Sequence, residues 1–495
     1  MKDRSKLKVT VIGGGLGGMS TSLRLSKLGF NVTLMEKNSN LGGKLSVFNK
    51  NGYNFDMGPS LITLPQYFRE LYSDLGEDMD NHLKLERLDP MCRYKFQEGQ
   101  KFDYFSSMGK LREEFKLVNE NFENFENFLN IGSKIYNISD KTFLNNPVLS
   151  RNNSLSTKDL LGFPFRKTIS SYDKLINNLF NSEMLKRIFN RYPTYIGSSP
   201  YNSPAMFLII PYIEYAFGSW YVKGGLYQII QSLKKLMKKN NVKLLVNCTV
   251  EKINTTITTS INCGIYFSPI LISYEKSSGV TDIVINNGDS GNTNHLLGKT
   301  NLEKVDDYSM SGYVLMLGVK KEFNSLEHHN ILFSKSYKKE FNNLFKERCF
   351  PEEPTVYICN SSKTDSTAAP DGCSNLFIMA NAPASNSDWT KLDTEKARTS
   401  VIETLNVHNI HLKETEIEVE KCLTPNYFKN QHLSIGGSLY GKNSHGLKNS
   451  FFRNKNKDPE IKGLFHVGGT SHPGGGTPTV IKSSKITASL INNEY

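Results

Sequence analysis

A glycine-rich turn near the start of this 495-residue chain constrains its fold more than any other stretch. Apolar residues at 9–12 predict a short strand, and apolar residues at helical spacing from Met19 onward predict a helix directly after it. Between them, the pattern G-x-G-x-x-G is fitted by Gly13, Gly15 and Gly18, with Gly17 as a further glycine of the turn. In this pattern the first glycine permits a tight turn, the second lets the backbone approach a pyrophosphate, and the third lets the helix pack closely on the strand. The stretch therefore predicts a dinucleotide-binding unit at the start of an α/β domain.

An acidic residue and a second glycine cluster narrow the choice of dinucleotide. Glu36 ends the next predicted strand, at 32–35, where a carboxylate can bind the ribose hydroxyls of FAD or NAD. The second glycine cluster follows, and after it come a short predicted hairpin and the sequence FDMGP. These stretches place five residues near the first glycine turn: Gly42, Gly43, Lys44, Gly58 and Pro59. NAD-dependent Rossmann domains usually continue with another helix here, so this arrangement resembles the amine-oxidase-like FAD flavoproteins.

Composition excludes several classes of protein. Lys and Arg number 60 against 48 Asp and Glu, but the charge is spread along the chain without an Arg-rich arm or zinc-finger spacing, so no nucleic-acid partner is predicted. Seven scattered cysteines without a CxxC pair favour a reducing cytosol. No secretory signal is evident, and no apolar run approaches the roughly 20 residues of a membrane span. A protein of this kind that works at a membrane would lie on its surface.

The middle of the chain departs from the alternation of strands and helices. Phe115, Phe122 and Phe125 belong to an apolar stripe at helical spacing within 115–136, which predicts one amphipathic helix. A stripe that faces the protein core is the favoured interpretation, and a lipid-facing stripe is the alternative. Basic residues follow, which could touch anionic headgroups but more commonly form a solvated face: Lys158, Arg166, Lys167, Lys174, Lys186, Arg187 and Arg191.

Strands and helices alternate again from residue 220. Gly224 and Gly225 open a predicted helix with one apolar face. The further elements that the pattern predicts are strands at 243–246, 250–253 and 281–289, with an exposed hairpin region at 255–278.

Five stretches together carry a family resemblance over essentially the whole chain. They read VIGGGLGG, LGGK, FDMGPSLITLP, YIGSSPYNSPAMFLIIPYIEYAFGSWYVKGGLY and HVGGTSHPGGGTPTV. The first two are shared widely among FAD enzymes, whereas the last three are more specific. With these stretches the chain resembles the carotenoid desaturase family of bacterial phytoene and diapophytoene desaturases.

The resemblance implies an α/β fold in which two domains are interleaved. A Rossmann-like FAD-binding domain of the amine-oxidase and phytoene-desaturase type would comprise residues 1–70, 219–305 and 426–495. An α+β substrate and membrane-associating domain would comprise 71–218 and 306–425. The resemblance further implies FAD as the cofactor, a long apolar polyene as the substrate, oxygen or quinone as the electron acceptor, and a cytoplasmic protein associated peripherally with the cytoplasmic membrane.

The closing segment would complete the cofactor site. Residues 463–467 predict a strand, and Thr477 as N-cap with Pro478 at the first helical position predicts a helix whose N–H groups and dipole face a bound group. By resemblance that group is the flavin ring with its ribityl chain, while Val250 lies against the adenine. The residues of this segment assigned to the cofactor are Gly468, Gly469, Gly475, Gly476, Thr477 and Pro478.

The resemblance implies that a hydride passes to the flavin and that a proton leaves the adjacent carbon of the polyene. Two residues are candidates for catalysis: Glu214, a charge within an apolar stretch, and His472, beside the flavin-facing loop. For each of them a structural role is the alternative. No metal site is predicted, because the pairs at 328–329 and 408–411 have no Asp, Glu or Cys nearby at ligand spacing.

The substrate chemistry stays open between two branches of the family. Stretches within 311–372, among them SGYVLMLGV and HHNILF, resemble the flavoproteins that oxidise a terminal methyl group of a diapocarotene to an aldehyde at least as well as they resemble the desaturases. The leading hypothesis is an FAD-dependent carotenoid desaturase of carotenoid biosynthesis. The alternatives are the terminal oxidase and, from another class, a non-catalytic FAD-containing carotenoid-binding protein.

Overall fold

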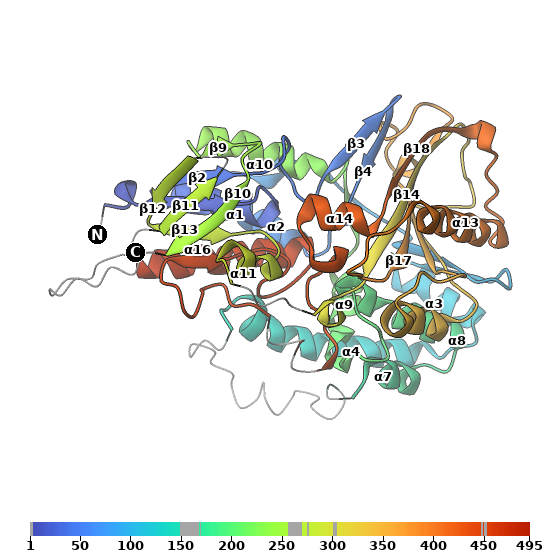
Figure 1. Ribbon diagram of the computed structural model, residues 1–495. Coiled ribbons are helices and arrows are strands. Elements are labelled where there is room, and N and C mark those ends of the chain that lie inside the picture. Colours follow the sequence, from blue (N-terminus) through green and yellow to red (C-terminus); the bar gives the residue numbers. More distant parts are fainter. Residues whose placement is uncertain are drawn as a thin grey trace.

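The computed structural model describes residues 3–148, 168, 170–255, 270–274, 277–299, 304–446, 449 and 453–495. Two large sheets lie on opposite sides of the molecule, and a layer of helices lies below the second sheet (Figure 1). Both ends of the chain lie beside the first sheet, at the left of the view. Segments that are distant in sequence therefore share a layer.

The first sheet is parallel and has five strands in the order β19-β13-β1-β2-β9. Its strands are β1 (Lys8–Ile12), β2 (Asn31–Met35), β9 (Lys243–Leu245), β13 (Ile283–Asn286) and β19 (Leu464–His466). The helices α1 (Leu16–Lys27), α10 (Tyr227–Lys239) and α16 (Thr477–Glu494) accompany it, and α1 packs against the other two. The beginning, middle and end of the chain thus build one Rossmann-like layer, as the sequence predicts.

Val250 begins a separate small sheet. It starts β10 (Val250–Thr255), which pairs antiparallel with β11 (Ile270–Tyr274), and β11 pairs with β12 (Ser277–Thr281). The strand predicted at 250–253 is confirmed. Part of the hairpin region predicted at 255–278 lies outside the described residues.

The second sheet has seven strands in the order β18-β14-β17-β16-β15-β6-β7. Its strands are β6 (Cys92–Lys95), β7 (Lys101–Tyr104), β14 (Ser311–Val319), β15 (His329–Leu332), β16 (Val356–Asn360), β17 (Ser374–Ala382) and β18 (Ile417–Leu423). Successive side chains of a strand point to opposite faces. On β14, Leu315 and Leu317 share a core cluster with residues of α13 (Lys391–Val407), whereas Val314 and Met316 belong to a different cluster. The two faces of the sheet therefore pack in different core clusters, and the second cluster includes Tyr53 and Phe55 of β4.

The helical layer contains two helices where the sequence predicts one. The elements of this layer are α3 (Met108–Leu117), α4 (Phe122–Ser139), α7 (Tyr172–Leu179), α8 (Glu183–Asn190) and α9 (Ile209–Phe217). The predicted helix is interrupted because Asn119 has a φ of 52° and the Asn121 side chain caps α4 by accepting a hydrogen bond from the Glu123 amide. Its phenylalanines are buried in one aromatic core cluster, so the stripe faces the protein core. Among the described helices, none is both long and apolar enough to cross a membrane.

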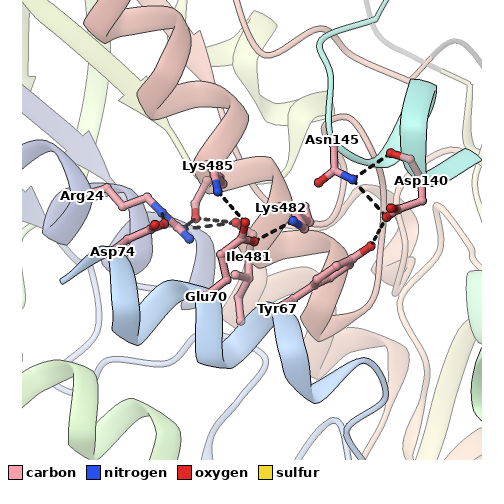
Figure 2. Close-up of polar contacts among 10 residues, drawn as sticks. Arg24, Tyr67, Glu70, Asp74, Asp140, Asn145, Ile481, Lys482 and Lys485 are labelled. Atoms are coloured by element: carbon pink, nitrogen blue, oxygen red, sulfur yellow. Dashed lines mark hydrogen bonds and ion pairs between the residues drawn. The ribbon is translucent and has the colours of Figure 1, made fainter. Parts of the chain in front are cut away.

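A polar network fastens the closing helix to α2 (Pro65–Asp74) (Figure 2). The Glu70 carboxylate accepts hydrogen bonds from Lys482, at 2.6 Å, and from Lys485. Arg24 of α1 donates to Asp74 at 2.9 Å and also contacts α16. Because Lys482 is only 5% exposed, its ammonium depends on this carboxylate.

The remaining elements are short. The strands are β3 (Val47–Lys50), β4 (Tyr53–Asp56), β5 (Leu85–Arg87) and β8 (Trp220–Val222), and the helices are α11 (Thr293–Leu296), α12 (Tyr337–Asn342) and α14 (Pro425–His432). Five-residue π-helical turns lie at Asp140–Leu144 and Asn343–Glu347. Helical turns of the 3₁₀ type lie at Arg4–Lys6, Met79–Asn81, Tyr192–Ile196, Ala205–Leu208, Ser290–Asn292, Val305–Asp307, Ser361–Lys363, Glu414–Glu416 and Ile435–Gly437. The five domain segments given above, with boundaries at 70, 218, 305 and 425, stay a prediction.

Candidate active site

The glycine turn is closed by hydrogen bonds at the ends of β1 and β2. The Gly13 amide donates to the Met35 carbonyl at 2.8 Å, and the Gly14 amide donates to the buried Glu36 carboxylate at 2.6 Å. A Cβ atom at Gly18 would lie 2.2 Å from the Gly13 carbonyl oxygen, so close packing of helix on strand requires glycine at this position. Gly18 thus has the packing role that the motif predicts.

The second glycine cluster packs directly on this turn. The Gly42 amide donates to the Gly14 carbonyl at 2.8 Å, and a Cβ atom at Gly43 would lie 3.3 Å from Gly15 Cα. At Gly58 a Cβ atom would lie 1.9 Å from the Lys44 carbonyl oxygen. The two predicted clusters therefore form a single backbone surface. Burial lowers the pKa of the Lys44 ammonium, which donates to a backbone carbonyl.

The closing segment meets this surface from the other end of the chain. A Cβ atom at Gly17 would lie 3.2 Å from Gly468 Cα. Helix α16 begins at Thr477, which makes Gly476, with a φ of 108°, the N-cap residue. The prediction of Thr477 as N-cap and Pro478 as the first helical residue is therefore wrong by one position, because only glycine adopts that φ readily. No side chain among the described residues caps the first turn of α16, so its N–H groups remain available.

These segments open into one cavity of about 600 Å³. Every residue predicted to contact the cofactor lines it, with the exception of Gly18. Several other lining residues were not predicted from the sequence, among them Asn287, Gly288 and Asp289, which follow β13. The available signal was the sequence NNGD, which the prediction included in the strand at 281–289 although β13 ends at Asn286, because the carboxyl ends of parallel strands form ligand sites.

The same cavity extends over part of the face of the seven-stranded sheet that carries Val314. Its apolar lining there comes from β14, β15 and β17 and from α9: Val314, Ile331, Phe377, Met379, Ile210 and Ile213. Tyr357 of β16 adds a hydroxyl, which forms hydrogen bonds with Ser60 Oγ at 2.5 Å and His329 Nδ1 at 2.8 Å. A dinucleotide site and a largely apolar chamber are thus continuous.

Glu214 lines this chamber and is 2% exposed. Its carboxylate accepts hydrogen bonds from the hydroxyls of Tyr192, at 2.7 Å, and Tyr195, at 2.8 Å. The structure places this predicted catalytic candidate at the cavity, where a charged oxygen can meet a bound molecule. Its catalytic role stays a prediction.

Arg191 is also buried at this wall, with an exposed fraction of 6%. Its Nη2 donates to the hydroxyls of Tyr94, at 2.9 Å, and Tyr195, at 3.2 Å. The interpretation of Arg191 as a surface cation is wrong, because three tyrosine rings enclose its guanidinium. Of the other basic residues in that group, Lys158, Arg166 and Lys167 lie outside the described residues.

His472 lies outside the lining of the cavity. Its ring packs edge-on against Phe143, with centroids 4.5 Å apart, and its Nε2 is 2.8 Å from the Asn146 carbonyl oxygen. Burial lowers the pKa of this histidine. The geometry supports a structural role, and the predicted catalytic role gains no support from it.

The histidine pair at 328–329 is buried beside a cysteine from β16. Ligand atoms of His328, His329 and Cys359 lie within 4.8 Å of one another. Sequence spacing does not reveal this cysteine, because β15 and β16 approach each other only in the folded sheet. Burial lowers the pKa of His328 to about 3, so its imidazole is neutral. In the second histidine pair, at 408–411, His408 has a backbone hydrogen-bond partner instead: its Nε2 is 3.1 Å from the Phe333 carbonyl oxygen.

Comparison with known proteins assigns the chain to a class. It matches the family described as flavin containing amine oxidoreductase over residues 16–492. An oxidoreductase from Methanosarcina mazei has the same fold, with a TM-score of 0.64 at 16% identity over 98% of this chain and 100% of that one. The chain is therefore an FAD-dependent oxidoreductase of the flavin-containing amine oxidoreductase class.

Curated relatives define the family more closely. The 1-hydroxycarotenoid 3,4-desaturase of Flavobacterium sp. (strain P99-3) is 34% identical over 98% of this chain and 99% of its own length. The 4,4'-diaponeurosporene oxygenase of Staphylococcus haemolyticus (strain JCSC1435) is 31% identical over 99% of this chain and 97% of its own length. The chain belongs to the family of carotenoid desaturases and diapocarotenoid oxygenases.

Proposed function

We propose that FAD lies along the glycine surface with its flavin toward the apolar chamber. The residues present fit this group in three ways. Among the described residues, a Cβ atom at Gly15 would meet only Asn287 Nδ2 at 3.1 Å and the Gly42 carbonyl oxygen at 3.9 Å, which leaves a cradle for a pyrophosphate. The first turn of α16 offers uncapped N–H groups to an electron-rich ring. Glu36 lines the cavity where ribose hydroxyls would bind.

The proposed FAD contacts come from the first sheet, the second glycine cluster and the closing segment. They are Gly13, Gly15, Gly17, Glu36, Gly42, Gly43, Lys44, Gly58, Pro59, Val250, Gly468, Gly469, Gly475, Gly476, Thr477 and Pro478. Gly18 supports the turn by packing.

The reaction we propose is the desaturation of a long polyene in carotenoid biosynthesis. The observation that carries this proposal is the single cavity that joins the dinucleotide turn to the apolar chamber. When bound, FAD supplies the acceptor for a hydride from a C–H bond. The chamber holds the polyene and excludes water, and Glu214 takes the proton from the adjacent carbon as the double bond forms.

The second candidate is oxidation of a terminal methyl group to an aldehyde. Relatives named as diaponeurosporene and diapolycopene oxygenases favour it, at 31% and 30% identity. The stretches that resemble that branch form β14, β15 and β16, which line the chamber through Val314, Ile331 and Tyr357. A non-catalytic carotenoid-binding protein is the third possibility, and it predicts a flavin that polyene never reduces.

We further propose that the polyene enters from the surface of the cytoplasmic membrane and that oxygen or a quinone reoxidises the flavin. Half-buried apolar side chains on α9 and just before it support a lipid contact: Phe207, Ile209 and Tyr212. Binding of the purified protein to liposomes, measured by flotation, tests this contact.

The reaction is tested with the FAD-loaded protein and liposomes that carry diapophytoene or diaponeurosporene, with and without oxygen. Products that lose two hydrogens and absorb at longer wavelength support the desaturase. Oxygen added to the already conjugated substrate supports the terminal oxidase. A flavin that neither polyene bleaches under anaerobic conditions refutes both enzymes.

A further inference from the structure

Two histidines and a cysteine form a buried cluster behind the wall of the apolar chamber. His328, His329 and Cys359 are each at most 6% exposed, and none of them lines the cavity. One ligand atom from each lies within 4.8 Å of those of the other two. His329 and Cys359 are directly paired across β15 and β16, so their side chains share one face of the sheet. The fold thus gathers three side chains of metal-binding types at one place.

Each imidazole of this cluster has one nitrogen without a partner. His328 Nδ1 is 2.8 Å from Thr364 Oγ1, and His329 Nδ1 is 2.8 Å from the Tyr357 hydroxyl. Within the part of the chain that the structure describes, Nε2 of both rings is buried and has no hydrogen-bond partner. A buried unpartnered nitrogen costs free energy, and a bound ion is one explanation for it. Metal-bound histidines have this arrangement, because one ring nitrogen binds the metal while a hydrogen bond to the other orients the ring.

We propose that Nε2 of His328, Nε2 of His329 and Sγ of Cys359 bind one Cu⁺ ion. Thiolate and imidazole together suit copper or zinc. Structural zinc sites almost always have four protein ligands, whereas no fourth His, Cys, Asp or Glu of the described residues joins this group. The single charge of Cu⁺ is balanced by one thiolate, so the buried site stays neutral, which a divalent ion would not allow.

The protonation states of the three side chains suit this ion. Burial lowers the pKa of His328 to about 3 and also lowers the pKa of His329, so both imidazoles are neutral and keep a free lone pair. Burial raises the pKa of the Cys359 thiol to about 12, so without a metal the thiol keeps its proton. Binding of Cu⁺ forms a copper–sulfur bond and releases this proton to solvent, with no change of oxidation state.

The ion needs no open space in the folded protein, because it lies at bond length from its ligands. Metal bonds of about 2.0 Å to nitrogen and about 2.3 Å to sulfur place the ligand atoms of a trigonal site about 3.5–4 Å apart. Side-chain rotations that move each atom by about 0.5 Å reach this spacing. A buried site of this kind fills as the chain folds, while its ligands are still accessible.

The ion would also fix the direction of a hydrogen-bond chain at the chamber wall. With Nε2 of His329 bound to metal, the ring proton lies on Nδ1, which then donates to the Tyr357 hydroxyl. That hydroxyl in turn donates to Ser60 Oγ, 2.5 Å away. Tyr357 and Ser60 both line the cavity, so the ion would orient polar groups there without contacting a molecule bound in it.

Copper content of the full-length, FAD-loaded protein tests the inference. The protein is incubated anaerobically with Cu⁺ and an excess of the Cu⁺ chelator bicinchoninate, desalted, and analysed for metal. X-ray absorption then identifies the ligands. We expect about one copper per chain, bound by two nitrogens and one sulfur. This spectrum of the unmodified protein tests the site even if a variant does not fold.

Three variants separate this site from copper on other thiols. Cys359→Ala should lower the copper affinity about 100-fold or more, because it removes a ligand, and Thr364→Val about tenfold, because it removes the orienting hydrogen bond. Cys92→Ala is the matched control and should keep the copper. Cys92 is also a free buried thiol of the seven-stranded sheet, but it lies outside the cluster.

A protein that loses all copper to the chelator would overturn the inference, as would copper that Cys359→Ala retains. Zinc that is retained where Cu⁺ is not would refute the assignment to a monovalent ion. Metal content is measured without any polyene, so these outcomes do not depend on the proposed function.

Discussion

Replacement of Gly15 by alanine tests the FAD site most sharply. Gly15 has a φ of −73°, which alanine adopts freely. The added Cβ atom would lie 3.1 Å from Asn287 Nδ2 and 3.9 Å from the Gly42 carbonyl oxygen, so a small shift of one side chain accommodates it. At Gly18 the same atom would lie 2.2 Å from the Gly13 carbonyl oxygen, and the backbone has no room for it.

The two substitutions should therefore separate cofactor binding from folding. A methyl group in space that a pyrophosphate needs costs about 1–3 kcal/mol, and each 1.4 kcal/mol is about tenfold in Kd. We expect Gly15→Ala to raise the Kd of FAD about 5- to 150-fold and to change the free energy of unfolding of the apoprotein by less than about 1 kcal/mol. Gly18→Ala should lower that free energy by about 3 kcal/mol or more.

The assay is titration of apoprotein with FAD, followed by quenching of flavin fluorescence, together with urea unfolding of the apo forms. Gly109→Ala is the control, because its Cβ atom would meet only Ser107 Oγ, at 4.0 Å, far from the cavity lining. A Gly15→Ala protein with unchanged Kd would refute the pyrophosphate placement. A Gly15→Ala protein that is as unstable as Gly18→Ala would show that Gly15 serves packing instead.

Three further predictions concern buried charges. Burial raises the pKa of Glu340 from 4.5 to about 7, because the folded protein favours the protonated carboxyl. The contribution of this protonated carboxyl to the stability of the folded state is complete below pH 4.5 and is lost as the pH rises through 7. The unfolding free energy should fall by about 3 kcal/mol between pH 4.5 and 8, and Glu340→Gln should remove most of this slope in urea melts at several pH values. If Glu214 takes the proton from the polyene, Glu214→Gln should lower kcat at least about 100-fold and leave the FAD content unchanged. Normal turnover by this variant would exclude Glu214 as the proton acceptor. Glu70→Ala leaves the buried Lys482 ammonium unpaired and should lower the unfolding free energy by about 2 kcal/mol. Lys485→Ala should lower it less, because the Lys485 side chain is 40% exposed. Equal losses for the two variants in thermal or urea unfolding would contradict this order.

Local sequence patterns predicted the glycine surface that we propose holds FAD, because that surface is formed by backbone conformations. A glycine turn, the acid at Glu36 and the closing glycines must be encoded where they occur, since only particular residue types permit those conformations. The sequence could not place His472, because the direction of its ring depends on contacts with Phe143 and Asn146. It also predicted one helix across 115–136, where a left-handed Asn119 separates two.

The sequence by itself determined the class of the protein, the Rossmann-like sheet and the glycine surface that we propose holds FAD. Only the tertiary structure decided which residues line the apolar chamber, because its walls come from strands and helices distant in the chain. Arg191 reads as one more basic residue in the sequence, yet the fold buries it among tyrosines beside Glu214. The physical reason is that the role of a charged residue such as Arg191, which caps the end of α8, depends on the side chains that pack around it. Sequence periodicity does not report those neighbours.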